Sequence, residues 1–350
     1  MPQTDLTQGH VPLSLARLTA PMMMGVSSTI LVQVLEMGFI GQLSTGHVAA
    51  ITFTFPLTMV LTSIALGISI GTSSVIARSV GQQSQSPNNS DDVQRLGTHS
   101  LILVTVAMSA LALLCWLSLD PLFLALGAKA DMLPLIHSYM DIYLPGSILF
   151  TTSMILGSIM RANGSATAPG VIMTVGSLVH LMLDPILIFG WFGLPAMELS
   201  GAATAMTVTR FATLIVIMAF VLKGQMILTT DHLRAFFAST KRILHVGIPA
   251  IATNLIGPVT AAYITRLMAN YGETAVAGFG VAGRIESVAA MLMFALSGSI
   301  GPFVGQNIGA KRIDRVRQGV RASYQFSLIW GFAVALPLFV FGESISGVID

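Results

Sequence analysis

Three ionisable residues lie inside long apolar stretches of the sequence, where such residues are rare. Glu36 lies in one stretch, and His180 and Asp184 lie four residues apart in another. Four residues are about one helical turn, so the two side chains would share a helix face. A carboxyl group and an imidazole in a low-dielectric environment can share a proton and titrate as a unit. We therefore expect Glu36, His180 and Asp184 to bind or carry a proton.

The composition indicates that these residues lie within a membrane. Charged residues make up 9% of the 350 residues and apolar residues 54%, whereas a soluble protein carries roughly 25% charged residues. The mean hydropathy is +0.81. These values exclude a soluble, disordered or collagen-like chain. The net charge of +2 gives no indication of a nucleic-acid partner, and the single cysteine, Cys115, excludes an internal disulfide.

Nine apolar stretches are long enough to cross a bilayer as helices, which takes about 20 residues each. The runs are continuous, whereas strands of a membrane barrel alternate. With the N-terminus in the cytosol, most basic residues fall in cytosolic loops, as the positive-inside rule requires. We expect a multi-pass protein of the inner (plasma) membrane. The predicted spans are 15–40, 48–78, 99–119, 136–160, 167–190, 200–222, 245–269, 275–305 and 321–341.

An internal repeat relates the first spans to the last ones. Pro21 corresponds to Pro249, and residues 47–50 correspond to 275–278. A repeat of six spans preserves orientation, so it predicts two parallel six-helix lobes related by an axis along the membrane normal. Residues 1–230 would form the first lobe and residues 231–350 three spans of the second. Because prolines kink helices, we expect Pro21 and Pro249 to act as hinges.

Several stretches resemble the multidrug and toxic compound extrusion (MATE) transporters, of the bacterial and archaeal type. The resemblance implies twelve spanning helices in two lobes, and the exchange of cytosolic organic compounds for protons or sodium ions. By this resemblance the chain would be truncated at its C-terminus and would lack the last three helices. The matching stretches are 21–50, 161–164, 183–189, 201–205, 248–250 and 302–310.

The resemblance also implies a coupling-ion site at Glu36, where the family usually has aspartate. The family commonly carries asparagine where this chain has His180. An asparagine oxygen suits sodium, a hard cation that prefers oxygen ligands, whereas an imidazole nitrogen suits it poorly. We therefore favour proton coupling, and a sodium ion at Asp184 and Glu36 is the alternative.

Four further residues are predicted to line a substrate cavity. Gln33 and Met37 neighbour Glu36, and Arg284 and Glu286 are charged residues in a later span. Two residues correspond to about 200° around a helix, so Arg284 and Glu286 do not lie on one helix face. Glu286 could equally be a structural partner of Arg210, in an earlier span, or of Arg284.

The sequence predicts a secondary antiporter that exports amphipathic, mostly cationic compounds and drugs in exchange for H⁺ or Na⁺. We expect it to be a monomer in the bilayer, with no cofactor besides the coupling ion. An exporter of lipid-linked precursors or polysaccharides, from the same superfamily, is the alternative, and a multi-span receptor or channel is the non-transporter alternative. An enzyme is not predicted, because no metalloprotease, P-loop or cysteine–histidine motif occurs.

Overall fold

A computed structural model describes residues 5–84, 90–227, 235–269, 271 and 273–346 of the chain. The regular structure of these residues is helical. There are also two short 3₁₀ turns among these residues. η2 (Ala130–Met132) directly precedes α5, and η3 (Trp191–Gly193) follows α6. The helices are α1 (Val11–Gly41), α2 (Thr45–Gln83), α3 (Ser90–Leu117), α4 (Leu119–Ala125), α5 (Leu133–Ala162), α6 (Thr167–Phe189), α7 (Glu198–Lys223), α8 (Phe236–Ala269), α9 (Glu273–Gly309) and α10 (Ile313–Ser346).

Eight helices in the described part of the chain are long and apolar enough to cross a membrane: α1, α2, α3, α5, α6, α7, α8 and α9. They coincide with the first eight predicted spans, and the ninth predicted span falls in α10. Large apolar side chains such as Leu117, Met182 and Phe332 are exposed on the outside of the helices, as lipid-facing residues are. The prediction of an all-helical, multi-span membrane protein is confirmed.

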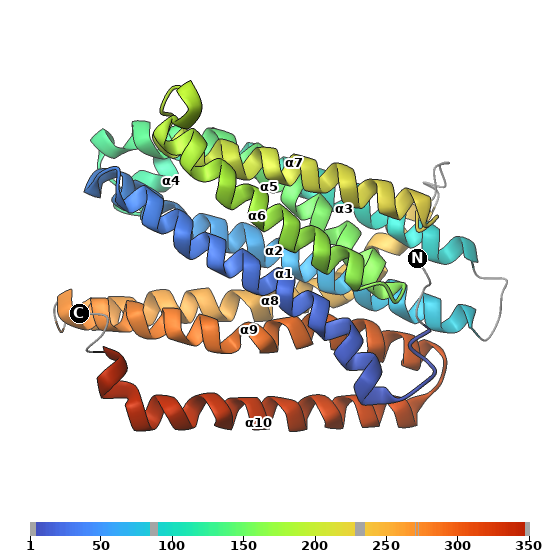
Figure 1. The fold of residues 1–350 in the computed structure, drawn as a ribbon. Helices are drawn as coiled ribbons and strands as arrows, with labels where there is room; N and C mark the ends of the chain where they lie inside the picture. The colour runs from blue at the N-terminus through green and yellow to red at the C-terminus, as the bar shows by residue number, and fades with distance from the viewer. Residues whose placement is uncertain (1–4, 85–89, 228–234, 270, 272, 347–350) are drawn as a thin grey trace.

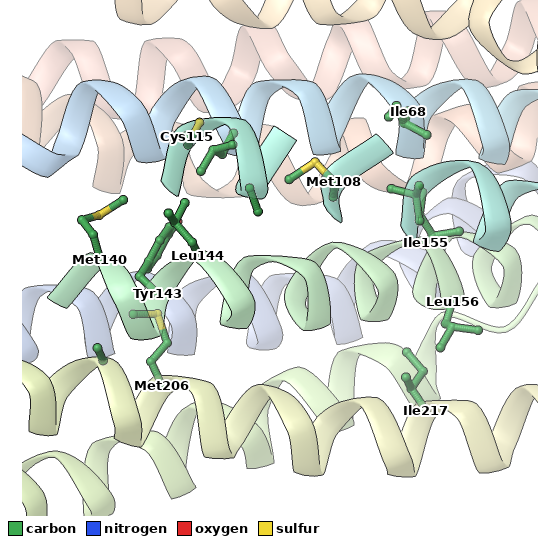
Figure 2. Close-up of a cluster of buried hydrophobic side chains, with 14 of the residues drawn as sticks. Ile68, Met108, Cys115, Met140, Tyr143, Leu144, Ile155, Leu156, Met206 and Ile217 are labelled. Atoms are coloured by element: carbon green, nitrogen blue, oxygen red, sulfur yellow. The ribbon is translucent and has the colours of Figure 1, made fainter. Parts of the chain in front are cut away.

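Helix α5 is the central element of the first six spanning helices. It packs against α2, α3 and α7, while α6 packs against α1 and α7. Figure 2 shows this core, in which Met108 of α3, Leu144 of α5 and Met206 of α7 are among the buried side chains. The arrangement fixes α1, α6 and α7 around one face of the core.

The last three helices pack onto α1 and α2. Helix α8 lies along α2, α9 contacts both α1 and α2, and α10 lies against α9 (Figure 1). Glycines allow the close approach: a Cβ added to Gly67 would lie 2.2 Å from Ile251 Cγ1, and one added to Gly71 would lie 2.4 Å from the Ile243 carbonyl oxygen. Small residues at such positions let membrane helices touch through their backbones.

Helices α1 and α8 run without a break through the two proposed hinge residues, Pro21 and Pro249. Helix α6 approaches α1 closely at Pro21, because a Cβ added to Gly170 would lie 2.4 Å from the Pro21 carbonyl oxygen. A bend of α1 at this point would therefore alter its contact with α6. The hinge role of both prolines stays a prediction.

Candidate functional site

Glu36, His180 and Asp184 come together where α1 packs against α6. The Nε2 atom of His180 lies 3.2 Å from Asp184 Oδ1 and 3.9 Å from Glu36 Oε1. One potential ligand atom from each of the three residues lies within 4.8 Å of the other two. We call these residues the acid–histidine cluster. Residues nearly 150 positions apart in the sequence thus form one group of titratable side chains.

The cluster is buried inside the helical bundle. Asp184 is 0% exposed and Glu36 is 9% exposed. Oδ2 of Asp184 and Oε1 of Glu36 are buried without a hydrogen-bond partner among the described residues, and His180 Nε2 and Asp184 Oδ1 face each other at 3.2 Å without hydrogen-bond geometry. A buried polar atom left unpaired costs about 1–3 kcal/mol, and more when it is charged. The cluster can therefore lower its free energy by taking up a proton or a cation.

Local sequence explains why α6 presents its two cluster residues together. His180 and Asp184 are one helical turn apart, and Pro185 follows Asp184 inside the helix. Proline has no N–H, so the carbonyl group one turn earlier loses its helical hydrogen bond. On the α1 side, Thr29 and Ser177 place their hydroxyl oxygens 3.1 Å apart and connect the two helices.

The donor atoms of the cluster suit a proton better than a sodium ion. Two carboxylates offer oxygen, but an imidazole nitrogen lies between them. A hard cation prefers a shell of oxygen ligands. A proton instead needs only one acceptor at a time, and His180 Nε2 lies 3.2 Å from one carboxylate and 3.9 Å from the other.

Arg210, an arginine inside a predicted span, and three aromatic residues of α5 form a second group of contacts, which the sequence analysis did not connect with the cluster. The guanidinium carbon of Arg210, on α7, lies 5.2 Å from the ring centroid of Tyr143 and 4.8 Å from that of Phe150. Tyr139 stacks on Tyr143 at 5.6 Å. Helix α7, which carries Arg210, packs against both α5 and α6.

In the sequence, this group of aromatic side chains is indicated only by the spacing of its residues. Tyr139, Tyr143 and Phe150 are four and seven residues apart in α5, which puts them on one helix face. The spacing alone does not say that Arg210 faces them, because that contact depends on how α5 packs against α7.

In the described part of the chain, no hydrogen bond or ion pair joins the residues predicted to line a substrate cavity to the acid–histidine cluster. Gln33 is exposed, Met37 is half-buried and Glu286 is exposed on α9. The side chain of Arg284 lies outside the described ones. Their roles in substrate binding stay predictions.

The sequence matches a known family over most of its length. The family model MatE matches residues 21–186 and 249–350. A protein of Shewanella oneidensis named "FAD transporter" is 33% identical over 342 residues, which are 95% of this chain and 73% of that protein. The "Probable multidrug resistance protein YoeA" of Bacillus subtilis is 24% identical over 303 residues, which are 85% of this chain and 64% of that protein.

The structure matches a solved transporter. The Vibrio cholerae MATE transporter VcmN in its bent form superposes with a TM-score of 0.88 at 29% identity, over 97% of this chain and 76% of that one. The chain thus spans 64% to 76% of the length of these three proteins. The family model, the relatives and the shared fold agree, and we conclude that this chain belongs to the MatE family, the multidrug and toxic compound extrusion transporters, which are not enzymes.

Proposed function

We propose that the chain belongs to an antiporter that exports amphipathic organic compounds in exchange for protons, and that the acid–histidine cluster carries the proton. The observation that carries this proposal is the burial of Glu36, His180 and Asp184 together, with polar atoms lacking hydrogen-bond partners. Ionisable side chains at membrane depth mark ion and proton pathways. The relative named as a multidrug resistance protein supports a drug-like substrate.

Exchange requires that the proton and the exported compound prefer different states of the transporter. Among the described residues, four helices bring charged and titratable groups to this interior: Glu36 from α1, Tyr139 and Tyr143 from α5, His180 and Asp184 from α6, and Arg210 from α7. With both carboxylates ionised and His180 neutral, these groups carry one net negative charge, which attracts an organic cation. Protonation of a carboxylate removes that charge and favours release.

The remaining parts of this proposal are the predictions made from the sequence. The N-terminus lies in the cytosol, the protein resides in the inner membrane as a monomer, and it needs no cofactor besides the coupling ion. Sodium is the alternative coupling ion, because the two carboxylates offer oxygen ligands.

A second candidate function is the export of an aromatic phosphate compound. The Shewanella relative is named for FAD, which joins an aromatic ring system to phosphate groups. Arg210, a fixed positive charge resting against aromatic rings, favours this candidate. An exporter of lipid-linked precursors has no comparable observation in its favour.

The first test is transport by the full-length protein in proteoliposomes, with a pH gradient and a sodium gradient imposed separately. We expect ethidium transport to follow the pH gradient. Asp184→Asn and Glu36→Gln should each reduce the rate by roughly ten-fold or more, because each removes a group that binds the proton. Glu198→Gln is the control, since that carboxylate is exposed at the start of α7. Normal transport in both cluster variants would overturn the proposal.

A further inference from the structure

Arg210 is a permanent charge at the middle of a membrane helix. It lies near the centre of α7, which is long and apolar enough to cross a bilayer. A guanidinium group stays protonated under all physiological conditions. A charged group at this depth is costly unless another group compensates it, so the contacts of Arg210 are informative.

No carboxylate compensates Arg210 directly within the described residues. None lies within 4.0 Å of its nitrogens there, and its NH1 atom is buried without a hydrogen-bond partner. Arg161, in the last turn of α5, differs: its NH2 group donates to Ser158 Oγ at 2.8 Å. The NH1 group of Arg210 can therefore donate hydrogen bonds that no described protein group accepts.

The guanidinium group of Arg210 lies over the faces of two aromatic rings. Its guanidinium carbon lies 4.8 Å from the ring centroid of Phe150 and 5.2 Å from that of Tyr143. A cation held over a ring face is stabilised by the ring quadrupole, and the contact does not use the N–H groups at the guanidinium edge. Those N–H groups form a planar fork that matches the oxygens of a phosphate.

Arg210 and Phe150 are both half-buried, in contrast to the buried Tyr139 and Tyr143. Helix α7, which carries Arg210, packs against α6, the helix of His180 and Asp184. Arg210 thus lies on a helix next to the one that carries two residues of the proposed proton site.

We propose that Arg210 is the anion-binding residue of the substrate site and receives the phosphate group of an aromatic compound during export. This inference rests on the proposed transport function and names a substrate class for it. Phe150 holds the guanidinium in place, and the free edge of the guanidinium donates to phosphate oxygens.

The test compares riboflavin with flavin mononucleotide, which share one ring system and differ by a phosphate. Transport of both compounds and of ethidium is measured with the full-length protein in proteoliposomes under a pH gradient. Arg210→Gln should lower flavin mononucleotide transport by roughly ten-fold or more, the loss expected for charged hydrogen bonds. Riboflavin, which has no phosphate, and ethidium, a cation, should not show this loss. Arg210→Lys should raise the KM for flavin mononucleotide and leave its maximal rate nearly unchanged, because lysine keeps the charge but not the fork.

Lys223→Gln is the matched control, since it removes an exposed positive charge from the same helix. Equal losses of all three compounds in Arg210→Gln would assign a structural role to the arginine and overturn the inference. If Arg210→Gln does not fold, the KM shift in Arg210→Lys decides the question by itself. Wild-type protein that carries ethidium but not flavin mononucleotide would overturn this inference and leave the proposed function standing. Failure with all three compounds would overturn the proposed function.

Discussion

His180 occupies the middle of the acid–histidine cluster. Its Nε2 atom faces Asp184 on its own helix and Glu36 on α1, at 3.2 and 3.9 Å. A protonated imidazole here would be attracted to two carboxylates, whereas a neutral one could accept a proton from either. His180 thus lies between two acids that the helices hold apart, and we expect the identity of this side chain to affect which ion the pair binds.

Replacing His180 by asparagine should change the ion dependence of transport. Asparagine supplies an oxygen between the two carboxylates, which suits sodium, and it does not titrate. We expect His180→Asn to show a flatter pH profile between about pH 5 and 8, where histidine changes its charge, together with a response to a sodium gradient. The measurement is ethidium transport at fixed pH steps with and without sodium.

His137→Asn serves as the control for this experiment. His137 lies outside the cluster and is partly exposed, with its Nε2 atom 2.7 Å from Asp120 Oδ1. Its replacement should leave the ion dependence of transport intact. If His180→Asn responds to protons and sodium as the wild type does, His180 has no part in ion selection.

The site was predictable from the sequence only where the information is local. His180 and Asp184 share a helix, so their spacing alone placed them on one face. Glu36 stood out as an acid in an apolar stretch, but its approach to His180 depends on how α1 packs against α6. Arg210 carried no local signal of its aromatic neighbours, because those come from α5.

At the scale of elements, glycines set the distance between α2 and the helices packed on it. The eight spans followed from apolar runs alone, but which helices touch could not be read from those runs, since all of them are apolar. The structure shows the reason for the glycines of α2: Gly67 and Gly71 face the backbone of α8, and Gly81 faces the Gln306 carbonyl oxygen of α9.

A methyl group at Gly67 should separate α2 from α8. The new Cβ would lie 2.2 Å from Ile251 Cγ1 and 2.6 Å from the Ile251 backbone nitrogen, and a backbone atom cannot move aside alone. Overpacking of this kind costs about 1–3 kcal/mol. We expect Gly67→Ala to lower the midpoint of thermal unfolding of the purified protein in detergent.

Gly331→Ala is the matched control for Gly67→Ala. Gly331 is also inside a helix, α10, but no heavy atom lies within 4 Å of a Cβ added there. Alanine at an open helical position raises helix propensity by up to about 1 kcal/mol relative to glycine. Gly331→Ala should therefore hold or raise the unfolding midpoint. Equal midpoints for the two variants would show that the α2–α8 contact is looser than described.

At the scale of the whole molecule, one end of the bundle is tied together by the segment that precedes α1. The backbone N–H of Leu6 donates to Gln306 Oε1 at 3.2 Å, and Asn307 Nδ2 donates to the Leu6 carbonyl oxygen at 3.1 Å. Arg315 of α10 donates to the carbonyl oxygen of Gly9 at 2.6 Å. Figure 1 shows the start of α1 beside the start of α10. These contacts join the beginning of the chain to α9 and α10.

The same set of hydrogen bonds also reaches the end of α5. Gln306 Nε2 donates to the Ala162 carbonyl oxygen at 2.7 Å, and Arg315 Nε donates to Asn307 Oδ1 at 3.1 Å. Leu6, fully buried, packs in a cluster with Ala166 and Phe303. One end of the first six spanning helices is thus fastened to the helices that follow them. A transporter that alternates its access must loosen such a fastening on one side of the membrane in each cycle.

Breaking this tie should open that end of the bundle more often. We expect Arg315→Gln to speed the thiol labelling of Ala166→Cys by roughly ten-fold, since several charged hydrogen bonds to the segment before α1 are lost. The labelling uses a Cys115→Ser background, because Cys115 is a native buried thiol. Arg317→Gln removes the same charge from an exposed position two residues further along α10 and should label at the background rate. Equal rates in the two variants would mean that these contacts do not limit the opening, whereas a selective increase with Arg315→Gln would identify the segment before α1 as one of the closures that alternate during transport.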